Sequence, residues 1–370
     1  MTKLFTPLRV GRVELSSRIA LAPLTRQRAN NDHVPMPFVK DYYAQRGSVP
    51  GTLLISEATL ISPRAGGRFN VPGIYTEAQI AAWKEVTDAA HAKGSYIYMQ
   101  IYAIGRVANL DALKAVGGGS TLYSSSPTPL DAESPIPREL TESEIQDFVE
   151  DHAQAARNAI AAGFDGVEIH AANGYLVDQF TQDNCNKRTD AWGGSVEGRA
   201  KFALDITRAV VDAIGADRTG IRLSPWSPFQ GMRMVDPKPQ FEYLARQIAK
   251  LRLAYVHLIE SRISGNADVD QDDRLDFFMR AYCNASPVIF AGGYDADSAV
   301  QAVDVKYADF DAIIGIGRPF ISNPDLPFRV KEGLPLVPYQ RETFYTPMDP
   351  KGYIDYEFSA EFKESVEAAA

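Results

Sequence analysis

Residues 164–180 read Phe-Asp-Gly-Val-Glu-Ile-His-Ala-Ala-Asn-Gly-Tyr-Leu-Val-Asp-Gln-Phe. The alternating run near the start of this stretch is typical of a β-strand. A period of two residues puts Glu168 and His170 on one face of that strand. A turn around Asn173 follows, and Tyr175 comes two residues later. The stretch therefore predicts that an imidazole, a carboxamide and a phenol gather just past the carboxyl end of a strand.

These three side chains suit one kind of chemistry. His170 and Asn173 can both donate hydrogen bonds to a single oxygen, and Tyr175 can supply a proton nearby. Two donors aimed at a carbonyl oxygen stabilise the charge that a reaction builds there. The alternative is purely structural: a buried histidine at a strand end, followed by polar residues that close a turn.

Strand-like and helix-like stretches alternate from this segment in both directions. Helices are expected at 37–46, 76–93, 141–162, 195–214 and 240–251, and from residue 296 onward. The stretches expected to form strands are 19–23, 52–58, 96–100, 166–170, 219–223, 255–258, 288–291 and 312–315. Eight strands separated by helices predict an α/β protein with a single (β/α)8 TIM barrel over residues 1–370. A doubly wound open sheet is the second choice.

Three long segments follow predicted strands. In a barrel, such loops lie at the catalytic end. Residues 106–140 are therefore a candidate lid, and residues 226–239 and 260–276 are candidate pocket walls.

The composition excludes several classes of protein. The chain has 370 residues, a net charge of −9 and two cysteines. A negative charge argues against nucleic-acid binding, and two cysteines are too few for a disulfide framework. No apolar run approaches membrane-spanning length, and the amino terminus lacks the apolar core of a signal peptide. We expect a cytoplasmic protein that does not bind membranes.

No metal site is expected. Asp268, Asp270 and Asp272 imitate the start of a calcium loop, but Asp273 stands where that loop needs glycine and Met279 where it needs glutamate. No pair of histidines has the spacing of a zinc motif. A solvated acidic loop is the simpler interpretation.

Glycines and an arginine follow the last two predicted strands. Gly292, Gly293, Gly317 and Arg318 occupy the loops that hold phosphate in many barrels. Glycines let backbone N–H groups approach an anion, and arginine can pair with it in a bidentate manner. These residues predict a phosphate-bearing ligand. The alternative is that the glycines only form tight turns and that Arg318 pairs with a carboxylate such as Asp325.

Arg222 interrupts an apolar strand, and a buried guanidinium is costly unless it meets an anion. The anion could be Glu168 on the neighbouring strand or a negatively charged ligand at the barrel mouth. Together with Gln100 and Thr25, which also lie at strand ends, Arg222 suits a flavin.

Several motifs occur in order along nearly the whole chain. They are Ala22-Pro-Leu-Thr-Arg26, Val167-Glu-Ile-His-Ala-Ala-Asn-Gly-Tyr-Leu176, Asn186-x-Arg-x-Asp-x-x-Gly-Gly-Ser195, Arg222-Leu-Ser-Pro225, Gly315-x-Gly-Arg-Pro-Phe-Ile-Ser-Asn-Pro-Asp-Leu326 and Gly352-Tyr-Ile-Asp-Tyr356. Together they resemble the Old Yellow Enzymes, which are FMN-dependent ene-reductases. The resemblance is closest to fungal members, including the ergot-alkaloid branch that acts on an unsaturated alkaloid aldehyde.

The resemblance implies a barrel with non-covalent FMN that NADPH reduces. By this resemblance, Thr25 would contact the flavin C4 oxygen region, Gln100 the pyrimidine edge and Arg222 the N1/C2 oxygen side. The full cofactor set would be Pro23, Leu24, Thr25, Ala58, Gln100, Arg222, Gly292, Gly293, Gly317 and Arg318, with the phosphate at Gly293, Gly317 and Arg318. The substrate would be bound by His170, Asn173, Tyr102, Phe344 and Tyr345.

The resemblance also implies a reaction. Hydride would reach the β-carbon of an α,β-unsaturated aldehyde or ketone, His170 and Asn173 would hold its oxygen, and Tyr175 would protonate the α-carbon. Isomerases of the ergot branch resemble these reductases but lack the tyrosine, so a flavin-dependent isomerase is one alternative and a non-catalytic flavin-binding protein is another. Ala58 and Tyr102 stand where yeast members carry glycine and tryptophan, so the substrate range cannot be carried over. A homodimer is possible.

Overall fold

The computed structural model describes residues 2–265 and 267–369. Residue 266, within the predicted loop 260–276, and the two terminal residues lie outside the described part of the chain, and the expectation of one domain over 1–370 stays a prediction. The centre of the fold is a closed barrel, as predicted. Its parallel strands are β3 (Ile19–Leu21), β4 (Leu53–Ile55), β6 (Tyr96–Tyr102), β9 (Gly166–Ala171), β10 (Thr219–Leu223), β11 (Tyr255–Ile259), β14 (Val288–Ala291) and β15 (Ala312–Ile316).

Pairing between neighbouring strands runs all the way round this barrel. The order is β4-β3-β15-β14-β11-β10-β9-β6, and β4 also pairs with β6, which closes the ring. The short β5 (Thr59–Leu60) extends β6 at its carboxyl end. A closed ring of parallel strands confirms the barrel and excludes the doubly wound open sheet.

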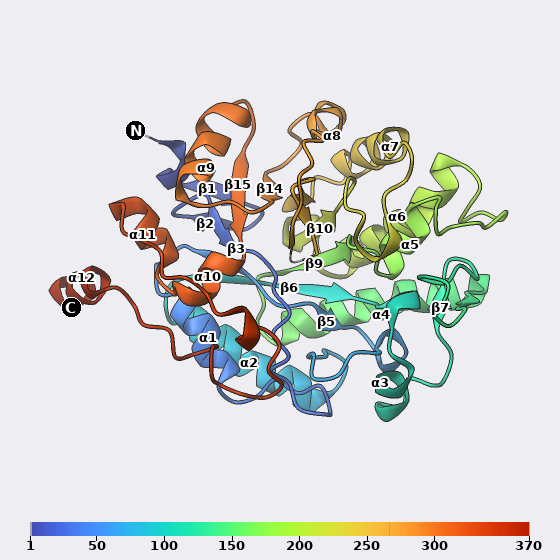
Figure 1. Cartoon of the computed structure of the whole chain (residues 1–370), viewed down its shortest axis with the longest axis horizontal. Helices are drawn as coiled ribbons and strands as arrows, with labels where there is room; N and C mark the ends of the chain where they lie inside the picture. Colours follow the sequence, from blue (N-terminus) through green and yellow to red (C-terminus); the bar gives the residue numbers. More distant parts are fainter. Residues whose placement is uncertain (1, 266, 370) are drawn as a thin grey trace.

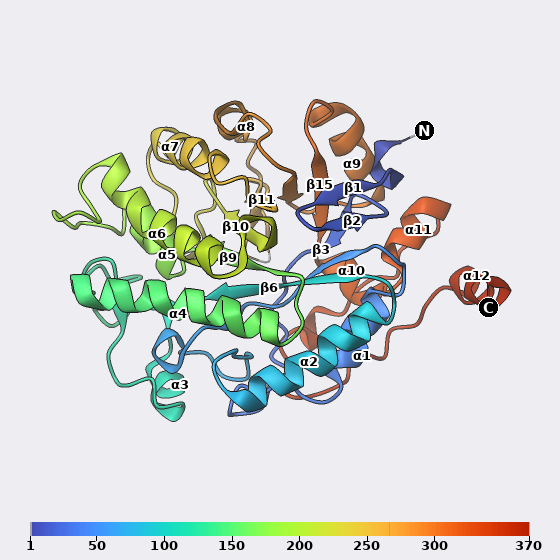
Figure 2. The same ribbon diagram turned by 180° about the vertical axis from the view of Figure 1, so that it is seen from behind.

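Helices surround the barrel and connect its strands (Figures 1 and 2). The connecting helices are α1 (Val39–Arg46), α2 (Glu77–His91), α4 (Glu142–Ala161), α6 (Val196–Ile214), α7 (Lys238–Ala249), α8 (Asp276–Tyr282) and α9 (Ala296–Gln301). Capping boxes begin three of them: Thr76 with Gln79 at α2, Thr141 with Glu144 at α4, and Asp295 with Ser298 at α9. Such reciprocal caps satisfy backbone donors that the first turn leaves unpaired, which is why the helices begin there.

A β-hairpin closes the amino-terminal end of the barrel. It consists of β1 (Leu8–Val10) and β2 (Val13–Leu15), joined through Gly11 at a φ of 54°. Its buried side chains pack with inward-facing residues from the first halves of the barrel strands, among them Leu53, Tyr98 and Ile289. The amino-terminal end of the barrel is therefore filled by side chains. The sequence analysis did not predict this hairpin.

Further elements lie after the strands and at the end of the chain. They are α3 (Leu110–Ala115), β7 (Tyr123–Ser124), β8 (Arg138–Glu139), α5 (Leu176–Thr181), β12 (Ile263–Ser264), β13 (Ala267–Asp268), α10 (Arg318–Ser322), α11 (Leu326–Glu332) and α12 (Ala360–Ala369). Most of these helices are shorter than two turns, and the strands are shorter than a typical strand. Tertiary contacts, rather than the periodicity of the sequence, therefore determine where these elements form. The segment between α11 and α12 returns to the barrel mouth, where Arg26 donates hydrogen bonds to the carbonyls of Phe344 and Gly352.

Candidate active site

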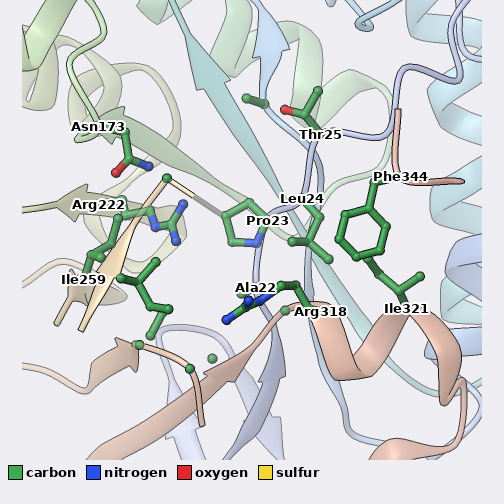
Figure 3. Close-up of a pocket in the computed structure, with 18 of the residues that line it drawn as sticks. Ala22, Pro23, Leu24, Thr25, Asn173, Arg222, Ile259, Arg318, Ile321 and Phe344 are labelled. Atoms are coloured by element: carbon green, nitrogen blue, oxygen red, sulfur yellow. The ribbon is translucent and has the colours of Figure 1, made fainter. Parts of the chain in front are cut away.

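A cavity of about 610 Å³ opens at the carboxyl ends of the barrel strands. This volume lies within the range of roughly 300–1,000 Å³ that small-molecule sites occupy. Figure 3 shows Asn173, Arg222 and Ile259 on one side, Ile321 and Phe344 on the opposite side, and the segment from Ala22 to Thr25 between them. Residues far apart in sequence therefore meet in one site, at the end of the barrel where the sequence predicted it.

His170 lies one residue before the end of strand β9, beside Arg222, its register partner on β10. The imidazole is buried, with 3% of its surface exposed. Burial lowers the pKa of His170 well below its ordinary value, and the positive charge of Arg222 lowers it further. At neutral pH the ring is uncharged, so it carries one N–H that can donate to a ligand oxygen.

Asn173 lies in a turn that several hydrogen bonds fix. Its backbone has a φ of 58°, a left-handed conformation that asparagine tolerates better than most residues. Its N–H donates to Ser224 Oγ at 2.8 Å, and its carbonyl accepts from Gln230 Nε2 at 2.6 Å. The next N–H, that of Gly174, donates to Asp178 Oδ2 at 2.8 Å. Since the backbone is satisfied by these partners, the carboxamide is left available at the cavity wall.

Tyr175 lies beside His170 in the same cavity. Its ring packs edge-on against His170, with centroids 4.9 Å apart, and against Tyr102, with centroids 5.2 Å apart. Burial raises the pKa of Tyr175 above its ordinary value, and the Arg68 guanidinium offsets part of that rise. At neutral pH the phenol keeps its proton, as a proton donor must.

One of the two anions considered for Arg222, Glu168, has other hydrogen-bond partners. Glu168 instead accepts a hydrogen bond from Gln100 Nε2 at 2.6 Å and lies 2.8 Å from His257 Nδ1. Among the residues that the structure describes, Nε of Arg222 is buried and has no hydrogen-bond partner. Glu168 still acts on Arg222 electrostatically, although burial has the larger effect and lowers the pKa of the guanidinium. A nearly buried cation without a hydrogen-bonded anion is expected to face a ligand.

The predicted phosphate residues come together at the other end of the cavity: Gly292, Gly293, Gly317 and Arg318 all line it. A Cβ at Gly317 would lie 3.1 Å from Leu24 Cδ2, so a larger residue would crowd the wall. The partner proposed for Arg318 in the structural alternative was wrong. Asp325 pairs with Arg329, and Arg318 pairs with Asp268.

The other predicted cofactor residues also line the cavity, namely Pro23, Leu24, Thr25, Ala58 and Gln100. Phe344 and Tyr345 do so as well. Tyr102 does not: it is 1% exposed and lies behind His170 and Tyr175, with centroid distances of 6.1 and 5.2 Å to their rings. The contact of Tyr102 with substrate stays a prediction. In the structure, Tyr102 packs against the rings of His170 and Tyr175.

Two of the three long loops contribute to the cavity wall, and the third does not. Residues 226–239 contribute Phe229 to the cavity wall, and residues 260–276 contribute Ile263, Gly265 and Asp268, as predicted for pocket walls. No residue of 106–140 lines the cavity, although this segment is described throughout. It is held to the side, where Arg106 donates to the carbonyls of Thr128, Pro129 and Gln230. This placement gives no support to the prediction that 106–140 forms a lid.

Sequence reasoning missed some lining residues, most notably Arg68 and Tyr339. The Gly66-Gly67 pair that precedes Arg68 was a usable signal, because paired glycines after a strand indicate a tight turn at the catalytic end of a barrel. Tyr339 lies in the irregular segment after α11, where the sequence offers no comparable signal.

The cavity fits the FMN that the sequence resemblance implies. One end combines glycines with Arg318, which suits a phosphate, and the other presents the orphaned Nε of Arg222 together with Gln100. Within residues 2–265 and 267–369, no group of three or more His, Cys, Asp or Glu side chains could hold a metal. In the same part of the chain, no helix is both long enough and apolar enough to cross a membrane.

Comparisons with known proteins agree with this geometry. Residues 3–337 match the profile of the NADH:flavin oxidoreductase / NADH oxidase family. The chain is 74% identical over 370 residues to a chanoclavine-I aldehyde reductase of Penicillium roqueforti (strain FM164), covering 100% of both chains. It is 53% identical over 367 residues to an NADP-dependent oxidoreductase of Aspergillus flavus, covering 97% of both. Its fold matches a solved old yellow enzyme homologue from Zymomonas mobilis with a TM-score of 0.88 and 38% identity, covering 96% of this chain and 99% of that one.

Proposed function

The chain belongs to the NADH:flavin oxidoreductase / NADH oxidase family, and from this premise we propose that it is an ene-reductase for an α,β-unsaturated aldehyde. Membership of the family makes it an oxidoreductase with FMN as cofactor. NADPH as reductant is supported by the NADP-dependent relative of Aspergillus flavus. An aldehyde substrate is supported by the reductase of Penicillium roqueforti, whose name specifies one.

The observation that carries the proposal is the grouping of His170, Asn173 and Tyr175 on one wall of the cavity. When bound, reduced FMN supplies a hydride for the β-carbon of the substrate. A neutral imidazole and a carboxamide can then hold the carbonyl oxygen on which charge develops. Each donor of this kind stabilises the transition state by roughly 3–4 kcal/mol.

Tyr175 supplies the proton that completes the reduction. Its O–H bond breaks as a C–H bond forms at the α-carbon of the substrate. Because its pKa is raised, the phenol is fully protonated before this step. The ring is held by His170 and Tyr102, which limits the directions from which the hydroxyl can reach a ligand.

The two alternatives explain less of the site. A flavin-binding protein without catalysis would need the phosphate cradle but no group of two donors and an acid. An isomerase would use the same cavity, but the protonated Tyr175 favours net reduction, because it fixes the product by adding a proton. A homodimer and a cytoplasmic location stay predictions.

The direct test measures NADPH oxidation by the purified protein without oxygen, with and without an enal. We expect substrate-dependent oxidation and a saturated aldehyde as product. A protein that binds FMN and accepts electrons from NADPH, yet reduces no enal or enone from a broad panel, would contradict the ene-reductase assignment. Recovery of a rearranged but unreduced aldehyde would instead favour the isomerase.

A further inference from the structure

Arg68 brings a positive charge into the cavity beside Tyr175. Both residues line it, together with Tyr345. Arg68 follows β5 in the chain, whereas Tyr175 follows β9, so the barrel alone brings the two together. Neither the family resemblance nor the sequence motifs assigned a role to Arg68.

The surroundings of Arg68 consist of phenols rather than carboxylates. Burial lowers the pKa of Arg68, but attraction to Tyr102, Tyr175 and Tyr345 and hydrogen bonding with Tyr175 outweigh this and raise it. In the part of the chain that the structure describes, no Asp or Glu lies within ion-pair distance of Arg68. By contrast, nearby Arg64 pairs with Asp147 and Asp151. A half-buried guanidinium that faces hydroxyls is therefore available to any negative charge that forms on them.

The backbone around Arg68 is fixed. Gly67 has a φ of 114°, and a Cβ there would lie 2.3 Å from Ala108 Cβ. Its carbonyl accepts a hydrogen bond from Asn109 N at 2.8 Å. On the other side, Asn70 donates from Nδ2 to the carbonyl of Ala29 at 3.0 Å. Because both flanks are anchored, Arg68 enters the cavity from one defined point.

We propose that Arg68 is a positioning residue for proton transfer, which orients the hydroxyl of Tyr175 and stabilises the phenolate that forms when Tyr175 gives up its proton. The inference rests on the proposed ene-reductase function. In the step concerned, the O–H electron pair stays on the Tyr175 oxygen, and the enolate electron pair of the substrate forms the new C–H bond. The phenolate afterwards regains a proton from water, so no further reactant is needed.

An arginine suits this role better than a lysine would. The guanidinium is planar, always charged and able to direct N–H groups at an oxygen in a fixed geometry. Apart from Arg222, the other ionisable groups that bear on Tyr175 are two phenols and an imidazole, so no carboxylate is among them. These groups are Tyr102, His170, Arg222 and Tyr345.

The test compares wild type with Arg68→Met, which removes the charge but keeps the bulk of the side chain, and Arg68→Lys, which restores it. In the anaerobic reaction of reduced enzyme with an enal, we expect Arg68→Met to slow flavin reoxidation by roughly 10- to 100-fold, the loss that removal of a hydrogen bond to a charged group causes. Arg68→Lys should recover most of the rate. Reduction by NADPH needs no proton from Tyr175, so its rate should change little.

Two readouts separate this role from a merely structural one. First, Arg68→Met should move the alkaline limb of the enal reaction to higher pH, because loss of the cation raises the pKa of Tyr175. Second, Arg68→Met/Tyr175→Phe should be no slower than Tyr175→Phe, since the arginine acts through the hydroxyl. Independent slowing in the double variant, or a higher KM at unchanged kcat, would overturn the inference.

The coupling can also be measured without any substrate. In protein carrying ¹³C at tyrosine Cζ, the Tyr175 resonance is identified by its absence in Tyr175→Phe, and its titration is compared between wild type and Arg68→Met. An upward shift in the variant supports the inference, and identical titrations overturn it. Wild type that reduces no enal would contradict the proposed function, whereas this titration tests Arg68 by itself.

Discussion

Arg318 donates two hydrogen bonds to the carboxylate of Asp268, from Nη2 to Oδ1 at 2.7 Å and from Nη1 to Oδ2 at 3.0 Å. The same carboxylate lies beside Gly293, where a Cβ would be 3.1 Å from Oδ1. A carboxylate therefore occupies the place in which a ligand phosphate is expected. The Asp268 side chain is 68% exposed, so it can leave Arg318 for solvent at small cost.

Replacing Asp268 should strengthen FMN binding. Asp268→Asn keeps the shape of the side chain but removes the charge that competes with phosphate for Arg318. We expect a lower Kd, by up to about fivefold, since an exposed ion pair is worth at most about 1 kcal/mol. Quenching of FMN fluorescence on titration of apoprotein measures this. Asp270→Asn, in the same loop but away from the cavity, is the matched control; equal Kd values for wild type and Asp268→Asn would show that the carboxylate does not compete.

Replacing Arg318 should have the opposite effect. Arg318→Ala removes a charge-assisted contact with the phosphate, worth roughly 1.5–3 kcal/mol. The variant should lose FMN during purification and bind it more weakly, as the absorbance spectrum and the same titration would show. Arg274→Ala is a suitable control, because Arg274 pairs with Asp276 at the surface. Full FMN retention by Arg318→Ala would place the phosphate elsewhere.

Phenols should bind to His170 and Asn173 as the substrate oxygen does. A phenolate held over oxidised flavin should give a long-wavelength charge-transfer band, and this band should weaken strongly in His170→Ala because one of two donors is lost. An absorbance titration with para-substituted phenols measures it. His91→Gln, whose parent residue pairs with Asp165 outside the cavity, should behave as wild type. Absence of the band in wild type would mean that the two donors do not face the flavin.

Removing the hydroxyl of Tyr175 should affect one half-reaction only. Tyr175→Phe keeps the ring contacts with His170 and Tyr102, and loss of a positioned acid typically slows a reaction by about 10²–10⁴-fold. Reoxidation by an enal should slow by that factor, while reduction by NADPH and reoxidation by oxygen should persist. Anaerobic stopped-flow absorbance decides this, with Tyr96→Phe as control. Equal slowing of both half-reactions, or of neither, would show that Tyr175 is not the acid.

Glu57 should make the protein less stable as pH rises. Burial raises its pKa from 4.5 to about 7, although a hydrogen bond from the backbone of Arg26 acts against this. Because the folded state binds this proton more tightly than the unfolded chain does, Glu57 stabilises the fold at acidic pH. This contribution to the free energy of unfolding, on the order of 3 kcal/mol, is lost as pH rises from about 4.5 to about 7. Urea unfolding of Glu57→Gln, compared with Glu14→Gln at an exposed site, should show that this part of the pH dependence disappears.

Asp178 also contributes to the pH dependence of stability, in the same direction as Glu57. Its pKa is also raised to about 7 by burial, so wild type and Glu57→Gln share its contribution. The difference between the two proteins isolates Glu57. A stability difference that does not vary with pH would mean that Glu57 ionises in the folded state as it does in the unfolded chain.

The regular elements could be read from the sequence because their causes are local. The capping boxes at Thr76 and Thr141 and the alternation in 166–170 reflect interactions within a few residues, and the strands and long helices formed where they were expected. The hairpin 8–15 and the short helices were missed, since such elements are stable only against the rest of the barrel.

The sequence by itself determined the barrel, its catalytic end and the residues that line most of the site. Alternation and helix caps act locally, and parallel strands must place their carboxyl ends together. Only the tertiary structure decided which charges meet. Glu168 was drawn to Gln100 and His257 instead of Arg222, Asp268 rather than Asp325 reached Arg318, and Arg68 came to face Tyr175. Such pairs depend on distances of a few ångströms between segments far apart in sequence, because hydrogen bonds and ion pairs form only when the two groups come that close.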